Sequence, residues 1–205
     1  MIYAILTTSL IRDNYDMRKK EYIDAIKINL EFLNEIPNIK IVIVENNNNT
    51  NSFLDDFSCE VIYTDNNWTA TSYNKGPIEL TDIHHVINIF DIKDDDFIIK
   101  ITGRYPIQNN SKFINTIKNN DLNNIDCVIR YGSFHEKKGT NKTNDCITGL
   151  IGMKCKYIKQ IDKNLNGFDD YIECKWAQVA NKLDEDRIII LDELGIFIRQ
   201  VEDIR

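Results

Sequence analysis

No apolar run in this sequence is long enough to cross a membrane, and its first residues lack the basic start of a signal peptide. The five cysteines include no Cys-x-x-Cys pair and have no histidine at the spacing of a zinc site. Neither a disulfide framework nor a zinc knuckle is therefore indicated. We expect a cytoplasmic protein with reduced thiols and no membrane span.

An excess of positive charge is also missing, because 25 lysines and arginines face 32 aspartates and glutamates, which gives a net charge of −7. Such a chain repels nucleic acids and anionic membranes unless its basic residues gather locally. We therefore expect no nucleic-acid partner, and a local site must hold any anionic ligand. The length of 205 residues suits one domain with a full hydrophobic core.

Glycine-rich phosphate loops are absent as well. The sequence has no G-x-G-x-x-G after its first apolar run and no G-x-x-x-x-G-K-[ST] anywhere. The standard dinucleotide site and the P-loop are thereby excluded. A sugar-nucleotide pyrophosphorylase would need a glycine-rich activating loop after the first strand, and TTSLIRDNYD, from Thr7 to Asp16, contains no glycine.

The first half of the chain alternates between strand and helix patterns. Apolar runs predict buried strands at Ile2–Leu6, Ile39–Val44, Glu60–Thr64 and Phe97–Ile101. Apolar residues at spacings of three and four predict helices between them, with stripes at Ile23, Ile26, Leu30 and Leu33 and at Ile83, Val86, Ile87 and Phe90. This alternation is typical of a parallel sheet with helices packed on its faces.

The second half is more mixed. Its patterns predict a short helix around Phe113, Ile114 and Ile117, a helix at Tyr171–Leu183, and strands at Cys127–Tyr131, Thr148–Met153, Arg187–Leu191 and Ile196–Val201. Together the two halves predict a single-domain α/β/α sandwich around a mostly parallel mixed sheet, spanning residues 1–205.

Polar residues follow each predicted strand of the first half. They read Thr7-Thr8-Ser9, Glu45-Asn46, Asp65-Asn66-Asn67 and Thr102-Gly103-Arg104-Tyr105. Open parallel sheets bind ligands at the carboxyl ends of their strands. We therefore expect these clusters to converge on one edge of the sheet, although a polar residue after a strand is usually only a turn.

Four stretches carry a resemblance to a known family: ILTTSLIR, IVIVENN, YNKGPIEL and IIKITGRY. With the order of elements, they resemble the GT-A type of nucleotide-sugar glycosyltransferase, in particular small proteins of large DNA viruses and of bacterial surface-polysaccharide loci. The resemblance implies a GT-A-like fold, a nucleotide-sugar donor and a glycan or glycoprotein acceptor. For a viral protein, the cytoplasm would be that of the host.

The resemblance also implies where the donor binds. It places Thr7, Thr8 and Arg12 beside the nucleotide and its phosphates, and Glu45 beside the base or ribose. The alternative for Glu45 is a solvated turn residue. Asn74, Lys75 and Gly76 open the helix beneath the donor sugar, where Lys75 would meet a phosphate at a helix N-terminus. The alternative for this segment is a capping turn.

Such enzymes usually carry Asp-x-Asp at the carboxyl end of the fourth strand, where it holds Mn²⁺ or Mg²⁺ against the diphosphate. Here Asp94, Asp95 and Asp96 precede that strand, about 15 Å or more from its other end at about 3.3 Å per residue. We expect them to form a solvated turn. Thr102-Gly103-Arg104 occupies the Asp-x-Asp position instead.

A cation at that position suggests that no metal cofactor is required, although Mn²⁺ or Mg²⁺ is still possible. Arg104, with Lys100, Lys75 or Arg12, would stabilise the charge that develops on the leaving diphosphate. The alternative is that Lys100 or Arg104 pairs with a structural carboxylate such as Glu79.

The stretch GFDDYIECKWAQVA, from Gly167 to Ala180, matches the region that supplies a general base in inverting members of the family. Glu173 and Asp170 are the candidates. The alternatives are helix capping for Asp170 and the capping-box position for Glu173.

We expect an inverting transfer of a sugar to a hydroxyl. Residues up to about 105 would form the donor half, and residues from about 106 the acceptor half. The competing hypothesis is a catalytically degenerate GT-A-like module that binds a nucleotide or a glycan.

Overall fold

The computed structural model describes residues 1–10, 15–47, 50–66, 75–132, 141–165 and 171–198. Its strands are β1 (Ile2–Thr8), β2 (Ile39–Glu45), β3 (Glu60–Tyr63), β4 (Phe97–Thr102), β5 (Cys127–Ile129), β6 (Leu150–Lys154) and β7 (Ile188–Ile190). Its α-helices are α1 (Tyr15–Leu33), α2 (Lys75–Ile89), α3 (Lys112–Asn119), α4 (Cys155–Ile158) and α5 (Ile172–Ala180). Two short 3₁₀ helices lie at Phe53–Asp56 and Glu185–Arg187.

The described strands form one seven-stranded sheet in the order β3-β2-β1-β4-β6-β5-β7. β1 pairs in parallel with both β2 and β4, and β2 pairs in parallel with β3. β6 runs antiparallel to its neighbours β4 and β5, while β5 and β7 are parallel. The sheet is therefore mixed but mostly parallel, as the sequence predicts.

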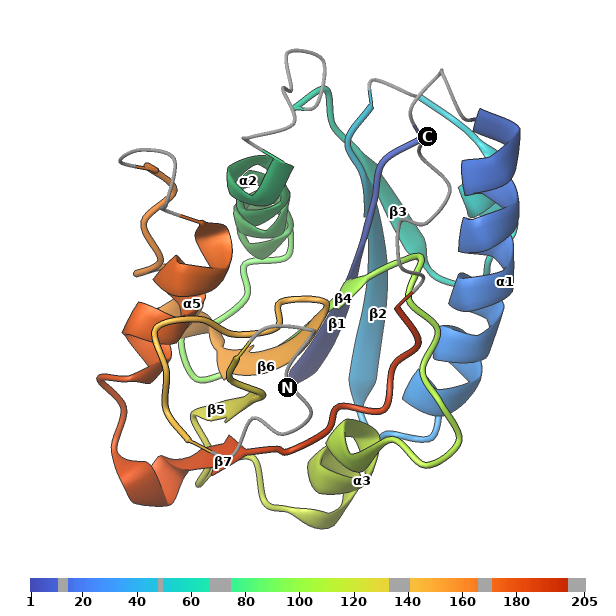
Figure 1. Ribbon diagram of the computed structural model, residues 1–205. Helices are drawn as coiled ribbons and strands as arrows, with labels where there is room; N and C mark the ends of the chain where they lie inside the picture. Colours follow the sequence, from blue (N-terminus) through green and yellow to red (C-terminus); the bar gives the residue numbers. More distant parts are fainter. Residues whose placement is uncertain (11–14, 48–49, 67–74, 133–140, 166–170, 199–205) are drawn as a thin grey trace.

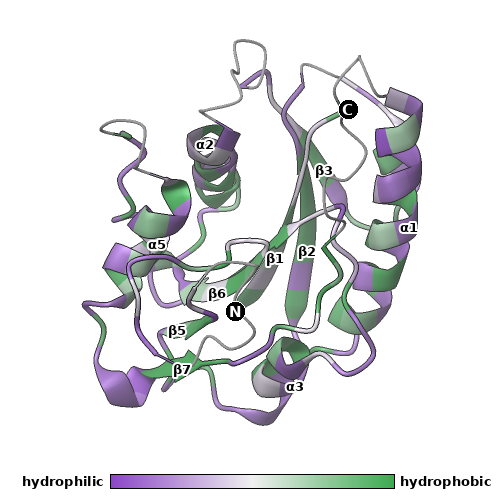
Figure 2. Cartoon of the chain, viewed as in Figure 1, coloured by the Kyte–Doolittle hydropathy of each residue, from purple (hydrophilic) through white to green (hydrophobic). Residues whose placement is uncertain are grey.

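The helices cover both faces of this sheet, with α1 and α3 on one side and α2 and α5 on the other (Figure 1). Alternate residues of β1 point to the two faces: Ala4 and Leu6 pack in the core under α1 and α3, and Tyr3 and Ile5 in the core under α2 and α5. Figure 2 shows the central strands as predominantly hydrophobic. The α/β/α sandwich is confirmed.

Most predicted elements are present with shifted ends. The helix predicted at Tyr171–Leu183 is the shorter α5, and the strand predicted at Cys127–Tyr131 ends at Ile129. The strand predicted at Ile196–Val201 is wrong in its described part, where Ile196 makes a single antiparallel bridge to Ile107. β-branched residues favour strands, but in residues 196–198 the pairing is limited to this bridge and to the Phe197 N–H, which donates to the Pro106 carbonyl.

α2 and α5 approach closely at Gly76. A Cβ atom at this position would lie 2.2 Å from Cγ2 and 2.7 Å from Cβ of Ile172, the first residue of α5. The glycine is therefore required by the contact between the helices, and not only by the backbone freedom of a turn. This contact sets the distance between the first turn of α2 and the first turn of α5, which both border the site described below.

We predict that Gly76→Ala lowers the free energy of unfolding by roughly 1–3 kcal/mol, because overpacking outweighs the gain of about 1 kcal/mol in helix propensity. Urea denaturation would measure the change. In an Ile172→Ala background the same substitution should cost less, since the nearest methyl group is gone. A Gly76→Ala protein more stable than the wild type would contradict this account.

Candidate functional site

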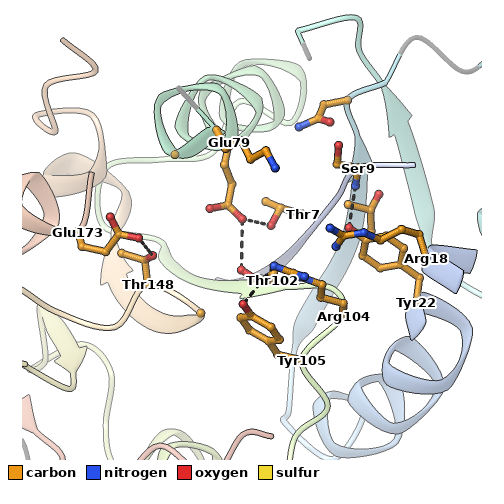
Figure 3. A pocket seen from close by; sticks show the side chains of 15 residues that line it. Thr7, Ser9, Arg18, Tyr22, Glu79, Thr102, Arg104, Tyr105, Thr148 and Glu173 are labelled. Carbon is orange, nitrogen blue, oxygen red and sulfur yellow. Dashed lines mark hydrogen bonds between the residues drawn. The ribbon is translucent and has the colours of Figure 1, made fainter. Parts of the chain in front are cut away.

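The order of the strands places a crevice at the carboxyl ends of β1 and β4. Successive strands add outward from β1 to β2 and β3, and the chain then returns to place β4 on the other side of β1. The position between β1 and β4, where the direction of strand addition reverses, is called the switch point, and open α/β sheets bind ligands there. A pocket of about 250 Å³ opens there. Figure 3 shows the side chains that line it. Its described lining residues are Thr7, Thr8, Ser9, Arg18, Tyr22, Asn46, Lys75, Gly76, Glu79, Thr102, Arg104, Tyr105, Thr148, Gly149 and Glu173.

Glu79, from the second turn of α2, connects the elements that form the wall of the pocket. Its carboxylate accepts hydrogen bonds from the hydroxyl groups of Thr7, the second-last residue of β1, and Thr102, the last residue of β4. Its Oε2 lies 2.8 Å from Nζ of Lys100. One carboxylate thus links a helix to the two strands at the switch point.

Lys100 has no contact with the pocket in this arrangement. Its side chain is 1% exposed, and Nζ donates to the Thr102 hydroxyl at 2.9 Å and to the Thr148 carbonyl at 2.6 Å, besides pairing with Glu79. An ammonium group has three donors, so all of them are used. The structure shows the alternative in which Lys100 pairs with Glu79, and direct contact with a phosphate stays a prediction.

Glu45, at the end of β2, is fully buried and is not a solvated turn residue. Its Oε2 accepts from the Thr8 hydroxyl at 2.6 Å, and its Oε1 accepts from the backbone N–H groups of Leu10 and Asn47. These bonds brace the segment that follows β1. Glu45 is not among the lining residues, so its expected contact with a base or ribose stays a prediction.

Asp82 of α2 organises the neighbouring strand ends. Its carboxylate accepts from Asn46 at 2.7 Å, Thr64 at 2.9 Å and Asn66 at 2.6 Å. Burial raises the pKa of Asp82, while these three hydrogen bonds oppose the shift. The network orients the amide of Asn46, whose buried Oδ1 has no hydrogen-bond partner in the described chain.

Gly103 allows the segments after β1 and β4 to meet. Its N–H donates to the Thr7 carbonyl at 2.9 Å, and a Cβ atom there would lie 2.9 Å from Cγ2 of Thr8. Only glycine fits this approach without a shift of its neighbours. The contact directs the next residue, Arg104, into the pocket (Figure 3).

Two guanidinium groups line the same part of the pocket, Arg18 from α1 and Arg104 from the segment after β4. Arg104 donates to the Tyr105 hydroxyl at 3.3 Å and lies over the Tyr105 ring. The Tyr22 hydroxyl accepts a hydrogen bond from the N–H of Ser9, and both residues also line the pocket. Burial raises the pKa of Tyr22 to about 12, and the charges of Arg18 and Arg104 act against that shift.

Glu173 faces the pocket from the first turn of α5. Its Oε1 lies 3.4 Å from the Thr148 hydroxyl, and its carbonyl accepts from the Cys146 thiol. α5 begins at Ile172, and its N-cap, Tyr171, makes no capping hydrogen bond from its side chain. The capping-box alternative for Glu173 is therefore wrong. Burial raises the pKa of Glu173, and the nearby Glu79 charge adds to this while Lys100 opposes it.

The described residues at the carboxyl end of β4 do not fit a divalent cation. Their nearest carboxylate, Glu79, is already paired with Lys100, and Arg104 brings positive charge into the pocket. The structure as far as it is described contains no group of three or more His, Cys, Asp or Glu residues able to hold a metal ion. Asp94 and Asp95 instead form surface ion pairs with Lys159 and Lys156, in the turn before β4.

Several predicted site residues do converge. Thr7, Thr8, Lys75, Thr102, Arg104 and Glu173 line the pocket, and Gly103 lies directly behind it. Arg12, Asn74 and Asp170 lie outside the described residues. Sequence reasoning missed Arg18, Tyr22 and Thr148, and treated Glu79 only as a possible structural partner. For these missed residues the sequence offered one signal: Tyr22 places a hydroxyl group on the buried face of α1, where apolar residues prevail.

Solved structures share this architecture. A glycosyltransferase involved in glycosylation of the major capsid of PBCV-1 superimposes with a TM-score of 0.53 at 10% identity, covering 93% of this chain and 82% of that one. A 4-diphosphocytidyl-2C-methyl-D-erythritol synthase gives 0.53 at 10% identity, covering 98% and 95%. A Pyrobaculum calidifontis mannosyltransferase in complex with GDP-Man and Mn²⁺ gives 0.51 at 9% identity, covering 93% and 56%.

The chain therefore has the fold of GT-A-type nucleotide-diphospho-sugar transferases. No protein-family model and no curated protein sequence matches it. Within the described residues, no helix has both the length and the apolar character that crossing a membrane requires.

We predict that Lys100→Met lowers the free energy of unfolding by roughly 3 kcal/mol, because it leaves the Glu79 carboxylate without its cation. Lys159→Met, which breaks the exposed pair with Asp94, should cost less than about 1 kcal/mol. Urea denaturation of both variants would test this. Equal losses in the two variants would mean that the Glu79–Lys100 pair does not stabilise the site.

Proposed function

We propose that this protein is a glycosyltransferase that moves a sugar from a nucleoside-diphosphate sugar to a hydroxyl of a glycan or glycoprotein. One observation carries the proposal. Two guanidinium groups and the half-buried carboxylate of Glu173 line the same pocket, at the carboxyl ends of β1 and β4. The cations suit a diphosphate, and the carboxylate suits a hydroxyl that must lose a proton.

In the proposed reaction, the Glu173 carboxylate takes the proton of the acceptor hydroxyl. The acceptor oxygen forms a bond to the anomeric carbon of the donor sugar, while the bond from that carbon to the phosphate oxygen breaks. The electron pair of the broken bond leaves with the nucleoside diphosphate. A single displacement of this kind inverts the anomeric configuration.

The surroundings of the second carboxylate support inversion. A retaining double displacement needs a nucleophile at the sugar. Glu79 accepts hydrogen bonds from Thr7 and Thr102 and is paired with Lys100, so its oxygens are already engaged. We assign Glu79 to the structure of the site and Glu173 to the chemistry.

We also propose that transfer needs no divalent cation, since the residues at the end of β4 are cationic where a metal site requires carboxylates. The donor half would comprise residues up to about 105, which supply most of the pocket, and the acceptor half the residues that follow, including Glu173. The buried or half-buried, unpaired cysteines fit a cytoplasmic location, that of the host if the protein is viral.

The competing function is a degenerate module that binds a nucleotide or a glycan without turnover. It is favoured by the absence of an Asp-x-Asp after β4. Calorimetry and donor hydrolysis, in which water replaces the acceptor, separate the two functions. UDP-glucose, UDP-galactose and GDP-mannose are suitable donors for this comparison.

We predict that Glu173→Gln retains donor affinity but lowers the rate of hydrolysis by roughly 100-fold or more, the usual loss on removal of a general base. The wild-type rate should rise with pH through an inflection above the ordinary glutamate pKa of about 4.3, because burial raises the pKa of Glu173 and the base acts when deprotonated. Asp95→Ala, at an exposed acid, is the control and should behave as the wild type. Donor binding with no hydrolysis in any variant would favour the binding module.

We predict further that hydrolysis proceeds at the same rate in EDTA and in Mn²⁺. The measurement is the release of nucleoside diphosphate under both conditions. Activity that depends on Mn²⁺ would overturn the metal-independent mechanism while leaving the glycosyltransferase function intact.

A further inference from the structure

Arg18 has an unusual environment for an arginine at the start of a helix. Its Nε is buried, yet it has no hydrogen-bond partner in the described parts of the chain. No carboxylate of the described residues forms an ion pair with Arg18 or with Arg104, whose hydrogen bond goes to the neutral Tyr105 hydroxyl. Both guanidinium groups point into the same pocket (Figure 3).

This arrangement is unfavourable without a ligand. A buried donor that lacks an acceptor has lost its hydrogen bonds to water without forming a hydrogen bond in the protein. Two cations that line one pocket also repel each other, and the low dielectric of the wall strengthens the repulsion. An anion between the two groups would remove both costs, and a planar guanidinium matches the oxygens of a phosphate with two parallel hydrogen bonds.

The described carboxylates that line the pocket are engaged elsewhere or come from another side of it. Glu79 is held by Lys100 and by the hydroxyl groups of Thr7 and Thr102. Glu173 enters from α5, on the opposite face of the sheet from α1. The remaining cation of the pocket, Lys75, is exposed at the first residue of α2.

We propose that Arg18 and Arg104 form a clamp that binds the diphosphate of the donor in place of a divalent cation. This proposal rests on the proposed glycosyltransferase function and adds Arg18 to its donor site. The diphosphate gains negative charge when the sugar leaves, so the clamp stabilises the transition state and the product more than the donor. A monophosphate can engage fewer of the clamp's hydrogen bonds, and a nucleoside none.

The test is calorimetry in EDTA with inorganic pyrophosphate, and with UDP, GDP and ADP, each beside its monophosphate. Arg18→Gln should weaken the binding of pyrophosphate and of the preferred diphosphate by roughly 10- to 100-fold. The monophosphate should lose less. Lys20→Gln, an exposed change of equal charge on α1, should leave all affinities near those of the wild type.

Thermal unfolding of the ligand-free proteins is the second readout. Arg18→Gln should be as stable as the wild type or more stable, because it removes a repulsion and an unsatisfied donor. A structural arginine would instead lower the melting temperature when replaced. Added pyrophosphate should raise the melting temperature of the wild type and of Lys20→Gln, but not that of Arg18→Gln.

The outcomes separate the clamp from the function on which it rests. Pyrophosphate binding that Arg18→Gln abolishes, without any binding or turnover of nucleotide sugars, would support the clamp and reject the glycosyltransferase. Nucleotide-sugar turnover that requires Mn²⁺ and is unchanged in Arg18→Gln would reject the clamp and keep the glycosyltransferase. Failure of the wild type to bind any diphosphate in EDTA would also overturn the clamp.

Discussion

The Glu79–Lys100 ion pair is the interaction on which the candidate site depends. Glu79 comes from α2 and Lys100 from β4, in the centre of the sheet. Their hydrogen-bond partners are Thr102, at the end of the same strand, and Thr7 and Thr148, from two further stretches of the chain. Because Lys100 is buried, a missing partner would leave a desolvated charge, which is far more costly than the pair itself is stabilising. The pair therefore specifies one arrangement of the pocket wall.

The pocket gathers positive charge although the protein is acidic overall. The net charge of −7 is spread over the whole chain, whereas Arg18 and Arg104 meet within one pocket and have no carboxylate partner in the described residues. Local charge decides binding at short range, since solvent and salt screen the distant acids.

The sequence was sufficient to predict the layers of the fold and the polar ends of β1, β2 and β4, because parallel strands bring their carboxyl ends to one edge. It could not place Thr148 and Gly149 in the pocket. They precede β6, and they reach the end of β4 only because β6 runs antiparallel to it, with Leu150 opposite Ile101. The direction of a strand depends on its pairing with strands that are distant in the sequence, so the local pattern of residues cannot predict it.

The same distinction applies to each charged residue. Residue order alone was enough to show that Thr102-Gly103-Arg104, and not an Asp-x-Asp, follows the fourth strand, and to predict that Glu173 lies near the start of a late helix. Folding in three dimensions was needed to turn Lys100 and Glu45 inward and to bring Arg18 beside Arg104. Strand and helix periodicity is encoded by neighbours along the chain, whereas the partner of a charge is chosen among residues far away in sequence, by burial and by geometry.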